Sequence, residues 1–378
     1  MCDVWNVLDS TVLYFYTSIL VKRSKNLSSI IKITLTMPIC KPGITGLTAF
    51  AATSAIIYLT TRKSRKHGNS SYTGIPPALL SGPHAAELKL AVQLALEAGS
   101  NMNFHLDTKG TKAGENSEAK LGINTKQNDS DFATEIDILN EKMVIEGIKK
   151  SFPNHEIIGE ESTGTGEVDP LTDKPTWIID PIDGTTNFAS GCCMTCVSIG
   201  FCVEGRPVMG VAFSPKTQEL YLAVDGLGAY RNGERIFSTD KGSKKTLKNS
   251  VVCFEFGYAR SEEGVDNMVN AVRRILKHGC RATRSYGSGV LDLCYVASGR
   301  LDVVYTGIAE EGWKPWDYCA AMVIAEEAGC TIRSLKGNDF DNVGKVIADS
   351  RFDIYSKSMI CGVNETVVEE CRKVVLDM

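Results

Sequence analysis

A short apolar run that ends in two aspartates constrains this chain more than any other feature. Residues 177–179 are Trp-Ile-Ile, and Asp180 and Asp183 follow them on either side of Pro181. The apolar run predicts a short buried strand, and Pro181 and Gly184 predict that the chain turns directly after it. Two carboxylates held so close together repel each other unless a positive charge lies between them.

A divalent cation is one solution to this repulsion. Magnesium prefers oxygen ligands and keeps positions open for water and phosphate oxygens, and Gly184 has no side chain to keep a ligand away from the backbone. An ordinary acidic turn is the other interpretation, because aspartate and proline are both common in turns. The choice between the two depends on the rest of the chain.

The charge of the chain is unevenly distributed. Its 378 residues include 41 Lys or Arg and 45 Asp or Glu, a net charge of −4. Residues 1–66 hold nine of the basic and two of the acidic residues, which leaves a net charge of −11 on the remainder. So acidic a body argues against nucleic acid as a partner, and an anionic substrate would need cations in the site. The thirteen cysteines form no paired zinc-binding pattern.

The amino-terminal segment differs in kind from the rest. No Asp or Glu occurs between residues 10 and 86, and residues 42–61 form an uncharged run of twenty residues. That length is enough to span a bilayer as a helix, and the basic cluster at 62–66 favours a cytosolic carboxyl side. The competing interpretation is a cleaved sequence for import into mitochondria or another organelle, which is also basic and poor in acids.

The sequence thus predicts four parts. They are a basic, poorly ordered segment at 1–41, a membrane-anchor helix at 42–61, a flexible basic linker at 62–82 and a catalytic domain at 83–378. A start at Met37 instead of Met1 would leave the anchor intact.

The predicted domain mixes helices and strands. Apolar periodicity predicts a helix over 88–99 that begins near Pro83, and a second helix over 137–150 with Ile136, Leu139, Met143 and Ile148 toward the core. Further helices are predicted over 290–297 and 317–328, with strands over 197–203, 208–213, 220–224, 251–256, 301–305, 346–348 and 359–363. This order indicates sheets covered by helices.

More acidic residues stand at predicted element ends. Glu160 and Glu161 follow the apolar residues 157–158, and residues 130–137 add acids before the second helix. Asp317 opens a helix of small residues, where an aspartate alone favours the N-cap position. Together, Glu160, Asp180, Asp183 and Asp317 are enough to hold two or three magnesium ions. Such clusters stabilise both the attacking and the leaving oxygen in phosphoryl transfer.

Three motifs carry a family resemblance. They are G-E-E-S at 159–162, W-I-I-D-P-I-D-G-T-T-N-F at 177–188, and W-D-Y-C-A-A at 316–321 followed by E-E-A-G at 326–329. Over roughly residues 85–370 the chain resembles the inositol monophosphatases, a family of the magnesium-dependent, lithium-sensitive phosphatase superfamily. The resemblance implies an α/β fold of α+β layers, the fructose-1,6-bisphosphatase-like α/β/α/β/α sandwich, and a homodimer.

The resemblance also implies the metal ligands. Glu160, Asp180 and the carbonyl of Ile182 would hold a first magnesium ion. Asp180, Asp183 and Asp317 would hold a second, and Glu160 would help to bind a weaker third.

The remaining roles concern water and phosphate. By the resemblance, Thr185, hydrogen-bonded toward Asp137, would orient a water for in-line attack on phosphorus, with Glu160 beside them. The backbone amides of Gly184 and Thr185, at a helix start, would receive the phosphate together with Asp183 and Asp317. The turn Gly287-Ser288-Gly289 would border the substrate ring. Its other interpretation is a plain helix start capped by Ser288.

The substrate is less constrained than the chemistry. Where the family carries a glutamate that contacts ring hydroxyls, this chain has Thr306, and an insertion follows that includes Glu310 and Glu311. Three hypotheses remain. The first is a phosphatase acting on inositol monophosphates. The second is a related phosphatase acting on 3′-phosphoadenosine nucleotides, histidinol phosphate or sugar phosphates. The third is a membrane-tethered, non-catalytic interaction protein.

Overall fold

A computed structural model of the chain describes residues 74–114, 121–128, 131–239, 244–309, 313–336 and 352–378. All of them belong to one unit, Ser70–Met378. The predicted segment 1–41, the predicted anchor helix at 42–61 and most of the predicted linker therefore lie outside the described residues. Within the described ranges, no helix is both long and apolar enough to cross a membrane.

The larger sheet positions the residues that the sequence singled out. Its order is β3-β4-β5-β6-β7-β8-β9. β3 runs parallel to β4, and each later pair is antiparallel. Short hairpins join the strands from β5 to β9, whereas residues 184–195 connect β4 to β5. The strands are β3 (Glu156–Gly159), β4 (Thr176–Asp183), β5 (Cys196–Val203), β6 (Arg206–Ser214), β7 (Glu219–Val224), β8 (Gly228–Arg231) and β9 (Glu234–Arg235).

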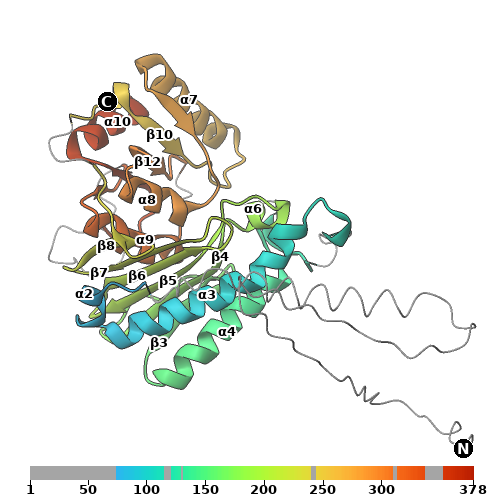
Figure 1. The fold of residues 1–378 in the computed structure, drawn as a ribbon. Coiled ribbons are helices and arrows are strands. Elements are labelled where there is room, and N and C mark those ends of the chain that lie inside the picture. Colours follow the sequence, from blue (N-terminus) through green and yellow to red (C-terminus); the bar gives the residue numbers. More distant parts are fainter. Residues whose placement is uncertain (1–73, 115–120, 129–130, 240–243, 310–312, 337–351) are drawn as a thin grey trace, which may run out of the picture. The chain divides into compact units, whose positions relative to one another are not determined.

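Helices cover both faces of this sheet (Figure 1). α3 (Ala85–Thr108) and α4 (Glu135–Ser151) pack on one face, and α8 (Gly289–Ala297) and α9 (Pro315–Glu327) on the other. Side chains of β4 alternate between the two faces, so Trp177 and Ile179 join the core under α3 and α4 while Ile178 joins the opposite core. A strand buried on both faces reads as a continuous apolar run, as residues 177–179 do.

A second sheet lies beyond α8 and α9. Its order is β11-β10-β12-β14-β13, and α7 (Glu262–His278) and α10 (Glu365–Leu376) cover its outer side (Figure 1). Its strands are β10 (Val251–Phe254), β11 (Ala282–Arg284), β12 (Val303–Thr306), β13 (Thr331–Arg333) and β14 (Met359–Gly362). Helices, sheet, helices, sheet and helices make five layers, which confirms the predicted α/β/α/β/α sandwich.

Short elements connect these layers. They are α2 (Pro77–Leu80), the 3-10 turns Lys112–Gly114 and Leu247–Asn249, the hairpin of β1 (Asn124–Asn128) and β2 (Asp131–Ala133), α5 (Glu160–Thr163) and α6 (Thr185–Ser190).

A close backbone contact fixes α9 against the larger sheet. A Cβ atom at Gly210 of β6 would lie only 2.1 Å from the carbonyl oxygen of Ala320 in α9. The small residues that follow Asp317 in α9 therefore serve a packing purpose, because a larger side chain on either element would push the helix away. This contact holds the first turn of α9, and with it Asp317, near the end of β4.

Most predicted elements are present, and two predictions differ from the structure. Residues 62–82 are predicted to be a linker, but Pro77–Leu80 form α2 and Leu79 is fully buried, so packing begins before residue 83. Leu139 is predicted to face the core but is 50% exposed, since the buried face of α4 includes Asp137, Asn140 and Glu141 instead of an apolar stripe. The strand predicted at 346–348 lies outside the described residues.

Candidate functional site

A bulge in β4 brings Asp180 and Asp183 to the same side of the sheet. Asp180 pairs with Ser198 of β5 and Asp183 with Cys196, so β4 has one residue more than β5 between these pairs. In a regular strand, residues three apart would point to opposite faces, and the extra residue corrects this. The sequence predicts that the strand stops before Asp180, which is wrong: β4 continues to Asp183, because the bulge accommodates Pro181 without ending the pairing.

Asp317 completes a cluster of three carboxylates. Side-chain oxygens of Asp180, Asp183 and Asp317 all lie within 4.8 Å of one another. Asp317 is the third residue of α9 and not its N-cap, which is Lys314. Its carboxylate accepts the backbone N–H of Lys314 at 2.7 Å, so it still serves the exposed amides of the helix start.

The electrostatics of this cluster fit a bound cation. Burial and the neighbouring charges of Glu160, Asp183 and Asp317 hold the pKa of Asp180 well above its usual value. Burial raises the pKa of Asp183 from 3.8 to about 7, although Ser288 and Cys196 act to lower it. Burial and the charge of Asp183 likewise raise the pKa of Asp317. Carboxylates this close stay ionised at neutral pH only beside positive charge, and a set of oxygen donors suits a hard divalent ion.

Glu160 stands at the edge of this cluster. It is the first residue of α5, directly after β3, as the sequence predicts. Its Oε1 lies 2.8 Å from Lys126 Nζ, which also lies 3.0 Å from Glu161 Oε1. Burial acts to lower the pKa of Lys126, but the two carboxylates outweigh it and raise that pKa. In the structure, therefore, Glu160 is paired with Lys126 and also acts on Asp180 of the three-aspartate cluster.

Glu141 of α4 orients the start of α5, to which Glu160 belongs. Its two carboxylate oxygens accept the backbone N–H groups of Glu161 and Ser162, each at 2.7 Å. Neither Glu141 nor Lys126 is predicted from the sequence. Glu141 reads as one more charged helical residue, and Lys126 lies in a polar stretch without apolar periodicity, so only the folded chain brings them to Glu160.

Thr185 and Asp137 form the second half of the site. The Thr185 hydroxyl lies 3.3 Å from Asp137 Oδ1 and 3.0 Å from the carbonyl oxygen of Ile182, and it donates to these acceptors. Asp137 is fully buried and accepts hydrogen bonds from Thr134, the N-cap of α4. Burial raises the pKa of Asp137 to about 7. The predicted partnership of Thr185 and Asp137 is therefore present in the geometry.

The backbone around Gly184 has little room. Gly184 has φ +79°, and a Cβ there would lie 2.9 Å from the carbonyl oxygens of both Gly287 and Met194. Only glycine adopts this conformation without strain. The close approach brings the start of α6, with its free amides, against the turn at residues 287–289.

Ser288 and Gly289 contact Asp183 in this structure. The Ser288 hydroxyl donates to Asp183 Oδ2, and the backbone N–H of Gly289 donates to Asp183 Oδ1 at 3.1 Å. Ser288 makes no side-chain capping bond to α8. The turn predicted to border the substrate thus also holds a carboxylate of the cluster, an interaction that separations of more than 100 residues hide from the sequence.

The fold and the cluster define a class: a five-layer α/β protein with a buried carboxylate site suited to metal ions. The sequence model of the inositol monophosphatase family matches residues 86–374. Inositol monophosphatase 1 of Sus scrofa is 35% identical over 272 residues, 72% of this chain and 92% of that protein. Inositol monophosphatase 2 of Solanum lycopersicum is 39% identical over 219 residues, 58% and 80% of the two chains.

Solved structures agree with these relatives. An inositol monophosphatase structure from Thermotoga maritima is similar with a TM-score of 0.61 at 28% identity, covering 77% of this chain and 97% of that one. One from Anabaena has a TM-score of 0.57 at 26% identity, covering 78% and 96%. The chain therefore belongs to the inositol monophosphatase family, as its motifs predict.

The raised pKa of Asp183 predicts how magnesium stabilisation depends on pH. Between its ordinary value of 3.8 and about 7 the metal-free folded state binds a proton that the unfolded state lacks. Metal-free stability therefore falls as pH rises through this window. A divalent cation at this cluster would have to displace that proton, so its apparent affinity would drop roughly tenfold per pH unit below 7 for each proton displaced. We expect a larger magnesium-induced rise in Tm at pH 7.5 than at pH 5.5, measured against EDTA. An equal rise at both values would contradict the assigned cluster, and Asp317→Asn should reduce the rise at both.

Proposed function

We propose that this chain is a metal-dependent phosphomonoesterase that hydrolyses inositol monophosphates to inositol and phosphate. The observation that carries the proposal is the convergence of Asp180, Asp183 and Asp317 beside the Thr185–Asp137 pair, in a chain of this family. Two to three magnesium ions would be held by these aspartates, Glu160 and the Ile182 carbonyl. When bound, magnesium supplies the positive charge that attracts the phosphate and makes a nearby water more acidic.

Thr185 and Asp137 would supply the proton acceptor. Asp137 is fully buried, and its contact with the partly buried Thr185 links it to the solvent side of the site. Thr185 Oγ1 would accept a proton from the attacking water while passing its own proton to Asp137 Oδ1. A carboxylate whose pKa lies at about 7 is well matched to this task near neutral pH.

The phosphate would be held at the start of α6. The first amides of a helix have no partner within the helix and point outward with partial positive charge. Here these amides belong to the segment after Gly184, directly beside Asp183, so the phosphate and the cations would share one site. Because the attack is by water, no covalent phosphoryl-enzyme is needed.

One observation favours a second substrate class. Thr306, which stands where the family carries a glutamate for ring hydroxyls, is only 1% exposed, and its hydroxyl has no hydrogen-bond partner within the described ranges. Glu310 and Glu311 lie outside the described residues. The Trp313 ring packs so closely on Gly289 that a Cβ there would lie 2.8 Å from it. An aromatic wall in place of a carboxylate suits a nucleotide, histidinol or sugar phosphate as well as inositol. The non-catalytic hypothesis has no such observation in its favour.

Phosphate release from a panel of substrates tests both classes. The chain should release phosphate from inositol monophosphates faster than from a 3′-phosphoadenosine nucleotide, histidinol phosphate or a sugar phosphate. The activity should require magnesium and be inhibited by lithium. Asp183→Asn should lower kcat/KM by more than about 100-fold, because even a residue behind a metal ligand typically costs 10–100-fold. The surface change Asp266→Asn is the control. Preference for a nucleotide would replace the first substrate class, and full activity of Asp183→Asn would show the site to be wrongly assigned.

We also propose that the chain forms a homodimer through α7. Val265, Val269 and Leu276 are 38%, 52% and 60% exposed on one face of this helix. Val269 and Leu276, with Phe256, border a hollow of about 410 Å³. The first turn of α7 carries Glu262 and Glu263 and its last turn carries Lys277 and His278. Two copies related by a two-fold axis would pair the apolar stripes and bring acidic ends beside basic ends.

Substitution on this stripe tests the dimer. Leu276→Glu places a charge in the proposed contact and should convert a dimer to a monomer, measured by light scattering after size-exclusion chromatography. Leu139→Glu, at an exposed apolar residue of α4, should leave the dimer intact. A wild-type monomer, or a dimer that survives Leu276→Glu, contradicts this interface.

The location of the chain is a further proposal. The uncharged run at 42–61 and the basic cluster at 62–66 support a membrane anchor with the catalytic domain in the cytosol. The full chain should then remain in the membrane fraction after carbonate extraction, whereas residues 70–378 should be soluble. If the protein is instead found inside an organelle without its amino-terminal segment, the result supports import followed by cleavage.

A further inference from the structure

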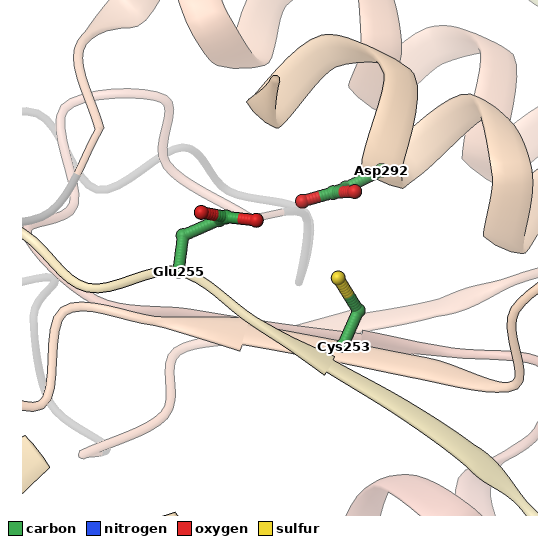
Figure 2. A group of neighbouring side chains, drawn as sticks. All are labelled: Cys253, Glu255 and Asp292. Atoms are coloured by element: carbon green, nitrogen blue, oxygen red, sulfur yellow. The ribbon is translucent and has the colours of Figure 1, made fainter. Parts of the chain in front are cut away.

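A second cluster of ionisable side chains lies behind the turn that holds Asp183. It consists of Cys253 on β10, Glu255 just after β10 and Asp292 on α8, whose side chains point toward one another (Figure 2). Their potential ligand atoms all lie within 4.8 Å of one another. None of the three is assigned a role by the proposed chemistry.

Glu255 fixes three consecutive residues of the turn. Its Oε1 accepts the backbone N–H groups of Tyr286 at 2.7 Å and Gly287 at 2.9 Å. Its Oε2 accepts the Ser285 hydroxyl at 3.2 Å. The next two residues, Ser288 and Gly289, donate to Asp183. Glu255 therefore holds Gly287, the residue directly before the two that orient Asp183, a proposed metal ligand.

Asp292 needs a proton in these surroundings. It is 0% exposed, and among the described residues neither of its carboxyl oxygens has a hydrogen-bond partner of ordinary geometry. The titratable groups with the largest effect on it are Glu255, Cys253 and Asp183, and none of these is a cation. Burial, and after it the charge of Glu255, hold the pKa of Asp292 well above its usual value. Asp292 is fully buried and Glu255 is partly buried, so two ionised carboxylates this close would repel each other, whereas one shared proton turns the repulsion into a hydrogen bond.

We propose that Glu255 and Asp292 are positioning residues: Asp292 keeps a proton and donates it to Glu255, and the pair holds the 285–289 turn so that Ser288 and Gly289 fix Asp183 for metal binding. This inference rests on the proposed function, since it concerns the metal site of that reaction. Loss of the pair should therefore weaken magnesium binding more than it lowers the rate at saturating magnesium. A carboxylate that accepts three hydrogen bonds is also better kept in place when its charge is balanced by a donor from behind.

Four variants of the full chain test this role. Asp292→Ala removes the donor, Glu255→Ala removes the acceptor of the turn, and Asp292→Asn keeps a donor of the same shape. Val296→Ala makes a comparable cavity elsewhere in α8, where Val296 is also fully buried. The readouts are the magnesium concentration for half-maximal phosphate release and, without any substrate, the magnesium concentration for the half-maximal rise in Tm.

We expect both alanine variants at the pair to raise these magnesium concentrations about 10- to 100-fold, the range found when partners of metal ligands are removed. Asp292→Asn should stay within about threefold of the wild type, by the same scale. Val296→Ala should lower Tm but leave the magnesium dependence unchanged. If Asp292→Ala does not fold, Asp292→Val, which fills the same space without a donor, carries the same expectation.

Several results would overturn the proposal. Asp292→Asn as damaging as Asp292→Ala would show that an ionised carboxylate is needed. If Asp292→Ala and Val296→Ala show the same magnesium dependence, the Glu255–Asp292 pair does not act on the metal site. Zinc that binds the wild type in excess magnesium and is lost in Cys253→Ser would make the cluster a cation site instead. If no substrate releases phosphate, the proposed function fails, while the Tm readout still decides the role of the pair.

Discussion

The mutual repulsion of buried carboxylates governs this structure. Asp180, Asp183 and Asp317 lie within 4.8 Å of one another, and each has a donor that orients it without cancelling its charge. Asp180 accepts the N–H of Ile182 at 3.0 Å, and Asp317 accepts that of Lys314. Such donors come from rigid backbone, so the carboxylates cannot relax away from one another. The fold therefore keeps a site that is unfavourable until cations enter it, as expected where a protein gives up stability for function.

Holding this cluster explains features that otherwise look unrelated. The bulge in β4 turns Asp180 and Asp183 to one side, and the small residues of α9 and Gly210 bring Asp317 to them. The left-handed conformation of Gly184 then brings the start of α6 against the turn that orients Asp183. Each feature would cost stability elsewhere in a protein. Here they serve the same small volume at the end of β4.

The sequence predicts the chemistry of the site better than its geometry. Asp180, Asp183, Glu160 and Asp317 can be singled out because acidic residues at element ends, beside glycine and proline, are a local signal. The bulge cannot be read this way, since it depends on the pairing of β4 with β5. Nor can the contact between Ser288 and Asp183, because the spacing of 105 residues carries no periodicity.

The predicted buried face of α4 is wrong at Leu139 for a related reason. Leu139 follows an apolar pattern but is half exposed, because α4 turns Asp137 and Glu141 inward to serve the site. A hydrophobic stripe predicts a buried face only where burial of apolar surface is what the helix contributes. In α4 the inward face carries the Thr185 partner and the carboxylate that orients α5. The sequence pattern is thus misleading at the positions where function replaced packing.

The two ends of the proposed substrate site are constrained differently, which would allow the ring contacts to change while the proposed metal ligands stay the same. The carboxylates are fixed from several elements at once, so that replacing one of them leaves buried donors and like charges unbalanced. The proposed opposite end is formed by Thr306, the last residue of β12, and by the connection from β12 to α9, whose Trp313 packs onto Gly289. Connections of this kind tolerate insertion because few buried interactions depend on them. Reaction and substrate preference can therefore diverge separately on this fold.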